Sequence, residues 1–282
     1  LSAWTMQGAM AALEDPVGTL RNAPHLLGAT AFGDRYLNWW VERNRELVRS
    51  ATKAGVVPGF EFEGLEKATP SLARLPGFKR VESHGFEAFL PIHRILMWDN
   101  IRRGEALVES MGLGHKGTAD VGQLTNEVIR NAPLYGAAAA VATGNAPEIT
   151  DDERMDEVML IALGFAGSAA WRRAVYEPLG DAAALSTSRK SRLAAESRAG
   201  KQTNRTSGVM NKQQLGITSE QSMVERTLFA RSPALTRNTL ILAKHALTDF
   251  GPEGAMARMY LAKTGFTMAA GMYVLKHELT GE

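Results

Sequence analysis

The chain has 282 residues, of which 45% are hydrophobic and 22% are charged, so it can bury a substantial core and differs in composition from a disordered tail. Its formal net charge of +2 is too small to indicate a nucleic-acid partner by itself. It contains no cysteine, which excludes disulfides, thiolate metal ligands and a cysteine nucleophile.

Helical signals dominate the N-terminal part of the sequence. Residues 1–14 contain no helix breaker, and Asp15-Pro16 then offers a start for a new helix. Apolar residues near a 3.6-residue period predict a further helix over residues 33–54, which Gly55 ends.

Residues 55–83 break this pattern. Proline and glycine interrupt regular structure repeatedly, while phenylalanine and leucine side chains recur among them. We expect an extended strap that lies on a helical body. The same segment is the candidate boundary between an N-terminal unit, residues 1–83, and a helical unit, residues 84–282.

The strongest helix signal follows this segment. Residues 84–111 place apolar side chains on one face and most charged side chains elsewhere, and Gly112 and Gly114 end the helix. A second helix is expected over residues 119–131, where Pro133 closes it.

The middle of the chain, residues 133–171, is rich in alanine and glycine. It contains an alanine run at 137–140 and a fourteen-residue uncharged run, Val158–Trp171. Between these runs, Thr150 and Glu153 form a capping-box pattern for the helix that follows.

Two apolar stretches raise the question of membrane contact. Val158–Trp171 has fourteen residues and Thr264–Leu275 has twelve, and both are shorter than the ~20 residues that span a bilayer. Small residues recur in both stretches and permit close helix packing in water or in lipid. We therefore expect buried core helices, with conditional membrane contact as the alternative.

Helical signals continue to the end of the chain. We expect a helix over residues 181–199, a polar and glycine-broken stretch over 200–216, and three helices over 219–230, 233–250 and 252–279. No stretch alternates with period two for long enough to indicate a strand. The sequence therefore predicts an all-α fold, a multi-helix assembly with an irregular strap.

Motifs for catalysis and metal binding are absent or weak. There is no phosphate-binding loop, HExxH motif or GxSxG elbow, and the six histidines are too widely spaced to pair on a helix face. His245 and Asp249 lie four residues apart, which we interpret as a surface pair rather than a catalytic base. The acidic residues between Glu148 and Glu157 offer ligands for Mg²⁺, but a helix N-terminus explains them without a metal. We expect no enzyme activity, no metal and no cofactor.

A basic segment, residues 186–212, is the main candidate binding feature. It holds seven basic residues and the single acid Glu196, a local charge of +6 over 27 residues. Such a strip can neutralise phosphates or meet an acidic partner protein, and a solvated face is the alternative. No aromatic residue lies within it, so base stacking is not indicated. The candidate contact residues are Arg189, Lys190, Arg192, Arg198, Lys201, Arg205 and Lys212.

Three stretches have a distinctive pattern: Phe89–Trp98 (FLPIHRILMW), Asn204–Gly216 (NRTSGVMNKQQLG) and Val224–Arg237 (VERTLFARSPALTR). A Gly-Pro pair at 251–252 and an apolar closing helix complete it. From Phe86 onward the chain resembles the C-terminal helical region of very large bacteriophage "polyvalent" proteins. Its residues 133–200 depart from the shorter spacing of that group.

The resemblance implies a non-catalytic segment of a virion polypeptide that enters the host with the DNA. We expect a segment of a longer internal virion or DNA-ejection protein, since the chain begins with Leu1 and not with methionine. Expected partners are portal or other internal virion proteins and further copies of the chain, with double-stranded DNA and the host membrane as additional candidates. The expected location is the virion interior, and the host envelope or cytoplasm after ejection.

Two alternatives stay open at this point. One is a non-catalytic domain of a virion-packaged enzyme such as an RNA polymerase or a peptidoglycan hydrolase. The other is a DNA-binding module that uses the basic segment. A cleft with converging carboxylates of shifted pKa would indicate that such a domain is itself an enzyme, and an exposed, unpaired basic face would favour the DNA-binding module.

Overall fold

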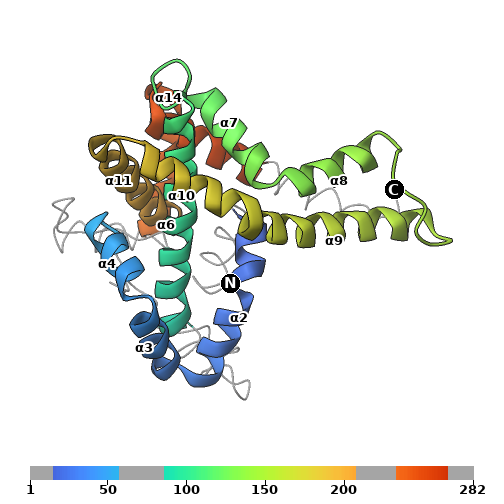
Figure 1. The fold of residues 1–282 in the computed structure, drawn as a ribbon, viewed down its shortest axis with the longest axis horizontal. Helices are drawn as coiled ribbons and strands as arrows, with labels where there is room; N and C mark the ends of the chain where they lie inside the picture. The colour runs from blue at the N-terminus through green and yellow to red at the C-terminus, as the bar shows by residue number, and fades with distance from the viewer. Residues whose placement is uncertain (1–14, 57–85, 208–232, 266–282) are drawn as a thin grey trace.

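The computed structural model describes residues 15–56, 86–207 and 233–265. Within these ranges the chain forms helices joined by turns and contains no strand, so the predicted all-α fold is confirmed. Figure 1 shows helices gathered around one long helix, with a two-helix hairpin projecting to one side. The predicted strap and the predicted helices over 1–14 and 219–230 fall outside the described residues, except for the first two positions of the strap.

Within each described range, the helices follow one another through turns and short loops. In chain order they are α2 (Pro16–Phe32), α3 (Asp34–Arg43), α4 (Arg45–Lys53), α6 (Phe86–Ser110), α7 (Ala119–Arg130), α8 (Ala132–Ala142), α9 (Glu153–Trp171), the π-helical turn η3 (Arg172–Tyr176), α10 (Glu177–Ser186), α11 (Arg189–Thr206), α14 (Pro233–Thr248) and a helix over residues 252–265.

The first helices begin and break at polar side chains. The predicted start at Asp15-Pro16 is confirmed, since the Asp15 carboxylate accepts a hydrogen bond from the Gly18 amide at 3.0 Å. The single helix predicted over residues 33–54 is wrong in one respect: it breaks at Asn44, whose side-chain amide donates to the Trp40 carbonyl at 2.8 Å. Asparagine competes for backbone partners in this way and so favours helix ends.

The long helix α6 is the centre of the fold. Helices α2, α3, α4, α10 and α11 all pack against it (Figure 1), and most of its residues from 88 to 108 are buried. Polar groups of α6 therefore find partners on the neighbouring helices. Arg103 pairs with Asp181 of α10 at 2.9 Å, and the Trp98 indole donates to the Glu196 carbonyl of α11 at 3.1 Å. One core cluster joins α6 to α3, α4 and α11 and contains Trp40, Ala51, Val56, Ile92, Ile95, Trp98 and Ala199.

A sharp turn at residues 187–188 separates α10 from α11, so the helix predicted over 181–199 is wrong in its bounds. Ser188 starts α11 by accepting a hydrogen bond from the Ser191 amide at 3.1 Å. Helix α11 then continues through Gly200, where the sequence predicts an irregular stretch. A Cβ atom at Gly200 would come within 2.3 Å of the Ala54 carbonyl oxygen, so this glycine permits close packing and does not break the helix.

Replacing Gly200 by alanine should destabilise the protein, although alanine favours a helix over glycine by roughly 1 kcal/mol. The new methyl group would displace the Ala54 carbonyl, and overpacking of this kind costs about 1–3 kcal/mol. In the control Gly136→Ala, on α8, the new Cβ would meet nothing within 4 Å, so stability should stay unchanged or rise. Urea unfolding of both variants measures the effect, and an unchanged midpoint for Gly200→Ala would contradict the close contact.

Candidate functional site: a helical arm and its polar base

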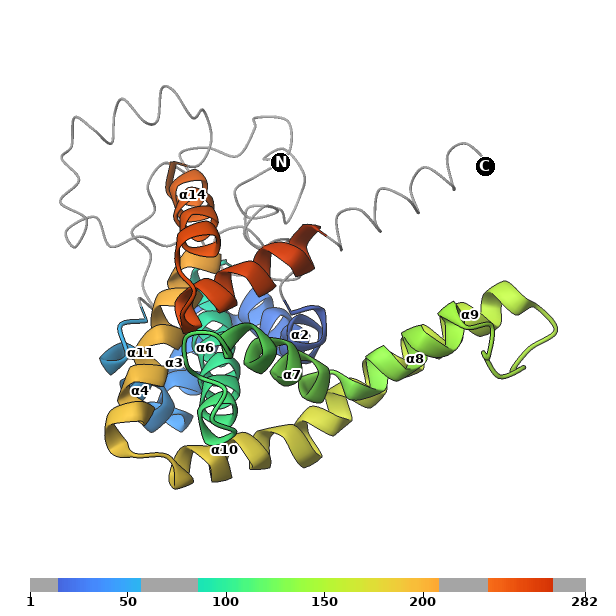
Figure 2. The ribbon, with the colours of Figure 1, turned by 90° about the horizontal axis from the view of Figure 1, so that it is seen from above.

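A helical hairpin that projects from the body is the first candidate. We call residues 132–171, which comprise α8, the connecting loop and α9, the arm. Its two helices pack closely on each other, and Figures 1 and 2 show them extending away from the helices around α6. Helix α8 is apolar on all sides, a composition typical of a buried helix, yet Ala137 alone among its residues is buried.

Small and polar side chains hold the two arm helices together. Gly164 lies so close to Ala137 that an added Cβ would come within 2.8 Å of the alanine Cβ. The Leu134 amide donates to the Ser168 hydroxyl at 2.9 Å. The inner faces of α8 and α9 therefore pack on each other, and beyond the base of the arm, where α9 also contacts α2, their outer faces have no partner among the described residues.

The outer face of α9 is an exposed apolar stripe. Seven residues fall within roughly 140° of the helix circumference, at about 100° per residue, and all are exposed. Val158 and Leu163 expose 64% and 58% of their surface. The expectation that residues 158–171 form a buried core helix is therefore wrong for this face. The stripe consists of Met155, Val158, Met159, Ala162, Leu163, Ala166 and Ala170.

Helix α9 continues through η3 into α10. Among the described residues, the resulting helix Met155–Ser186 is long and apolar enough, by length and composition, to cross a membrane, and 17% of its apolar window is buried. The uncharged run of fourteen residues thus underestimates the length of the helix that contains it. The second half of this helix packs on α6, which ties it to the body.

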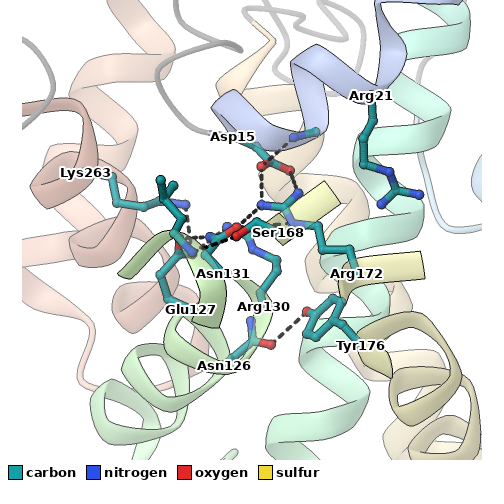
Figure 3. Close-up of polar contacts among 12 residues, drawn as sticks. Asp15, Arg21, Asn126, Glu127, Arg130, Asn131, Ser168, Arg172, Tyr176 and Lys263 are labelled. Atoms are coloured by element: carbon teal, nitrogen blue, oxygen red, sulfur yellow. Dashed lines mark hydrogen bonds and ion pairs between the residues drawn. The ribbon is translucent and has the colours of Figure 1, made fainter. Parts of the chain in front are cut away.

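The Arg172 guanidinium fixes the arm to the body and is 1% exposed (Figure 3). It forms a two-bonded ion pair with Asp15, with nitrogen–oxygen distances of 2.7 and 2.9 Å. Its Nε and Nη2 atoms also donate to the Asn131 side-chain oxygen. Asp15 caps α2 and Asn131 directly precedes α8, so one guanidinium connects the body to both helices of the arm.

Asn131 leads to a second buried charge, Glu127 of α7. One carboxylate oxygen of Glu127 accepts from the Asn131 amide at 2.7 Å and from the Tyr135 hydroxyl at 3.3 Å. The other oxygen pairs with Arg130 at 2.5 Å and with Lys263 at 3.2 Å. Lys263 belongs to the helix over 252–265, so the network reaches the C-terminal helices (Figure 3). We call this network the polar base; its residues are Asp15, Glu127, Arg130, Asn131, Arg172 and Lys263.

Opposite charges keep the two buried carboxylates of the polar base ionised. Burial by itself would raise the pKa of Glu127, but Arg130 and Lys263 lower it to about 2. Burial also opposes ionisation of Asp15, and Arg172 together with the more distant cations holds the pKa of Asp15 well below its usual range. A general acid or base works best when its pKa lies near the operating pH, so these carboxylates suit a structural role.

The π-helical turn η3 keeps a buried stripe of the continuous helix facing the body. Buried residues recur every four positions, a spacing that drifts around a regular α-helix by about 40° per step. The wider π turn offsets part of this drift. Tyr176 therefore points inward beside Arg172, and its hydroxyl donates to Asn126 at 2.8 Å (Figure 3). The stripe consists of Gly164, Ser168, Arg172, Tyr176, Gly180 and Ala184.

A small polar cavity adjoins the polar base. It has a volume of about 40 Å³, and its polar lining consists of Glu127, Arg130 and Lys263 of the polar base together with Glu105, Gln123, Asn126 and Gln202. One water molecule needs about 10–15 Å³, so the cavity holds a few waters, whereas small-molecule sites usually offer several hundred Å³. The described residues also contain no group of three or more His, Asp or Glu side chains placed to hold a metal ion.

The basic segment does not form a uniform basic face, because three of its basic residues are neutralised by carboxylates of neighbouring helices. Arg198 pairs with two carboxylates of α6 at 2.8 and 2.6 Å. Lys201 and Arg205 share the Glu253 carboxylate at 2.8 and 3.3 Å. These three predicted contact residues therefore hold α11 to its neighbours.

The N-terminal half of the basic segment is different. Arg189 and Lys190 are exposed and Arg192 is half-buried, and none of the three has an ion pair among the described residues. Lys212, the last predicted contact residue, lies outside the described residues. Of the six candidates among the described residues, three are therefore paired with carboxylates and three have no such partner there.

The acidic residues 148–157 lie at the outer end of the arm. Asp152 directly precedes α9 and accepts a hydrogen bond from the Met155 amide at 3.4 Å, so it begins the helix in place of the predicted Thr150. The Thr150 amide itself donates to the Asp156 carboxylate at 2.6 Å. These contacts order the loop, while Glu148, Asp151 and Glu157 at the tip are exposed.

His245 and Asp249 form the expected pair at the end of α14. One ring nitrogen of His245 lies 3.7 Å from the Asp249 carboxylate, and the other lies 3.3 Å from the Arg205 guanidinium. Both side chains are partly exposed, and neither lines the cavity beside the polar base.

Sequence reasoning does not identify the polar base. Asp15 and Arg172 lie 157 positions apart, and no spacing rule connects residues at that separation. The available signal is local: Arg172 directly follows the uncharged run that ends at Trp171, and Asp15 directly precedes the proline that starts α2.

No family model matches the chain, and no curated protein or solved structure matches it either. The function must therefore be inferred from the arm, the polar base and the sequence pattern of the chain itself.

Replacing Arg172 by methionine should destabilise the protein by about 3–5 kcal/mol, because Asp15 would be left as an uncompensated buried charge. The matched control is Arg173→Met, since Arg173 is exposed and has no ion pair among the described residues; it should change stability by less than about 0.5 kcal/mol. Urea unfolding gives both values, and hydrogen exchange over residues 132–171 reports whether the arm loosens. Equal stability of the two variants would show that Arg172 is not the anchor.

Acid should remove the contribution of Glu127 to stability. Its pKa is lowered from 4.5 to about 2 in the folded state, so the contribution is complete above about pH 4.5 and is lost as the pH falls toward 2. Glu127→Gln should be less stable than the wild type at pH 7 by an amount on the order of a few kcal/mol, and the difference should shrink below about pH 3. The control Glu157→Gln, at an exposed site of the arm, should match the wild type throughout. A constant gap between Glu127→Gln and the wild type would contradict the assignment.

Proposed function

We propose that the chain is a non-enzymatic docking segment of a bacteriophage internal virion protein, which attaches to other virion proteins through the outer face of the arm and assists delivery of the genome. One observation carries the proposal: the apolar stripe on α9 is exposed on a hairpin that stands clear of the body (Figure 2). Contiguous exposed apolar surface of this kind is typical of interaction sites. The virion setting comes from the resemblance of residues 86 onward to phage polyvalent proteins.

Burial of the stripe supplies a driving force for docking. Its four large side chains, at 155, 158, 159 and 163, are between 36% and 64% exposed. Full burial of such a side chain gains about 1.5–3 kcal/mol, so each would contribute about 1 kcal/mol on contact. The alanines among them permit a partner helix to approach closely.

The polar base would hold the arm at a defined angle during docking. The planar guanidinium of Arg172 bonds to Asp15 through two nitrogen atoms, a geometry that restricts rotation more than an apolar contact does. An arm held in this way loses less conformational entropy on binding than a loosely attached hairpin would.

The tip of the arm favours a protein partner over the interior of a bilayer. Glu148, Asp151, Asp152 and Glu157 are exposed there and would enter lipid first. Each charged residue placed at the centre of a membrane costs about 2.5–3.5 kcal/mol. A protein surface with complementary charge imposes no such cost.

The two alternative functions receive less support. For a DNA-binding module, the difficulty is that Arg198, Lys201 and Arg205 are already neutralised by carboxylates of the same chain. For an enzyme domain, the cavity beside the polar base holds only a few waters, and the adjoining Glu127 carboxylate is held ionised.

Incorporation of the chain into phage particles tests the proposal. The double variant Val158→Glu/Leu163→Glu places charge in the stripe and should lower the amount of chain in purified particles by at least about tenfold, equivalent to about 1.4 kcal/mol. The control Leu240→Glu/Leu247→Glu makes the same change at exposed leucines of α14 and should leave incorporation intact. Mass spectrometry of particles gives the amounts. Absence of the wild-type chain from particles, or normal incorporation of the stripe variant, would overturn the proposal.

A further inference from the structure

A second exposed apolar surface lies at the turn between α10 and α11, which we call the corner. Leu185 and Leu193, on either side of this turn, expose 81% and 53% of their surface. Residues 186–193 between and around them contain three basic residues and no acidic one, a local charge of +3. The corner is therefore both apolar and basic.

The positive charge of the corner is unfavourable at its position, the N-terminus of α11. Arg189 and Lys190 occupy the first turn of α11, and no acidic residue lies in that turn. The helix macrodipole favours negative charge at this end by about 0.3–1 kcal/mol per group, so cations here are unfavourable unless an anion lies nearby. The described residues place no such anion beside them.

The outer end of the arm has the opposite charge beside a similar apolar surface. Residues 148–157 contain six acidic residues and Arg154, a local charge of −5. Ile149 and Met155 are exposed among them, at the start of the apolar stripe. The arm tip and the corner therefore match each other in both respects: apolar side chains on each, and charges of opposite sign around them.

The two surfaces cannot meet within one molecule. They lie at opposite ends of the continuous helix Met155–Ser186, as Figure 2 shows for the loop before α9 and the turn after α10. A helix of 32 residues is about 48 Å long at 1.5 Å per residue. Contact between the arm tip and the corner therefore requires two molecules.

We infer that the partner of the arm is a second copy of this chain, whose corner receives the acidic tip and the adjoining stripe. The inference rests on the proposed docking role of the arm and names its partner. The contact joins two different surfaces, so each copy offers its arm tip and its corner either to one partner, around a twofold axis, or to two neighbours. Such contacts close into a ring when the rotation between copies allows it and otherwise continue as a filament.

Sedimentation of the purified chain over a range of concentrations tests the inference. The chain should associate at about 0.05 M salt, and the dissociation constant should rise at least about tenfold at about 0.5 M salt, where exposed charges are screened. The fold should survive the higher salt, because the polar base is buried and is screened much less.

Charge reversal identifies the surfaces. The tip variant Glu148→Lys/Asp151→Lys and the corner variant Arg189→Glu/Lys190→Glu change exposed residues that have no hydrogen bond or ion pair among the described residues. Each variant alone should associate at least about tenfold more weakly. An equal mixture of the two should associate again, because lysine-bearing tips then face glutamate-bearing corners and the unchanged acidic tips face unchanged basic corners. The control Arg35→Glu/Arg49→Glu, with the same change in net charge as the corner variant, should behave as the wild type.

Each outcome decides the inference. A chain that stays monomeric at about 0.1 mM in low salt, or variants that fail to recover on mixing, would overturn it. Binding to anionic or zwitterionic vesicles by an otherwise monomeric chain would assign the arm to lipid and would overturn it as well. Self-association of a chain that is absent from particles would defeat the proposed function alone, whereas a monomeric chain that is packaged through its stripe would defeat this inference alone.

Discussion

The buried guanidinium of Arg172 is the constraint on which the geometry of the molecule depends. Removing a charge from water costs several kcal/mol, and the attraction to a partner offsets this cost only when the geometry is good and the remaining donors are satisfied. Asp15 supplies the opposite charge through a two-bonded ion pair, and the side-chain oxygen of Asn131 accepts further hydrogen bonds from the guanidinium. Because the outer arm extends clear of the body (Figure 2), its direction is set where Arg172 connects α2, α8 and the continuous helix.

The polar base and the exposed apolar stripe have complementary roles in docking. The body obtains its stability from helices packed around α6, so the arm does not need to contribute to a shared core. Its apolar outer face then remains available for another molecule, at the cost of exposing side chains such as Leu163 to water. An arm that could swing would lose much of the benefit, since ordering it on contact would consume binding free energy.

Local rules predicted the helices, and long-range contacts decided what each helix does. Periodicity and capping residues gave α6 and the start of α2, while the breaks at Asn44 and at residues 187–188 depend on single side-chain bonds that periodicity does not register. The uncharged run 158–171 predicts burial, but composition cannot say whether the covering surface belongs to the same chain. The polar base escaped prediction because its ion pair joins residues 157 positions apart.

The basic segment is a second case in which the sequence gives the charges but not their long-range partners. In sequence it is one strip of +6, yet carboxylates of α6 and Glu253 neutralise three of its basic residues, whereas Arg189 and Lys190 are exposed without an ion pair among the described residues. Salt should screen the exposed charges of Arg189 and Lys190 more strongly than the largely buried pair between Arg198 and Glu105. Ionic strength can therefore regulate contacts at the corner and the arm tip while the arm keeps its orientation. Such a division suits a protein that assembles reversibly without unfolding.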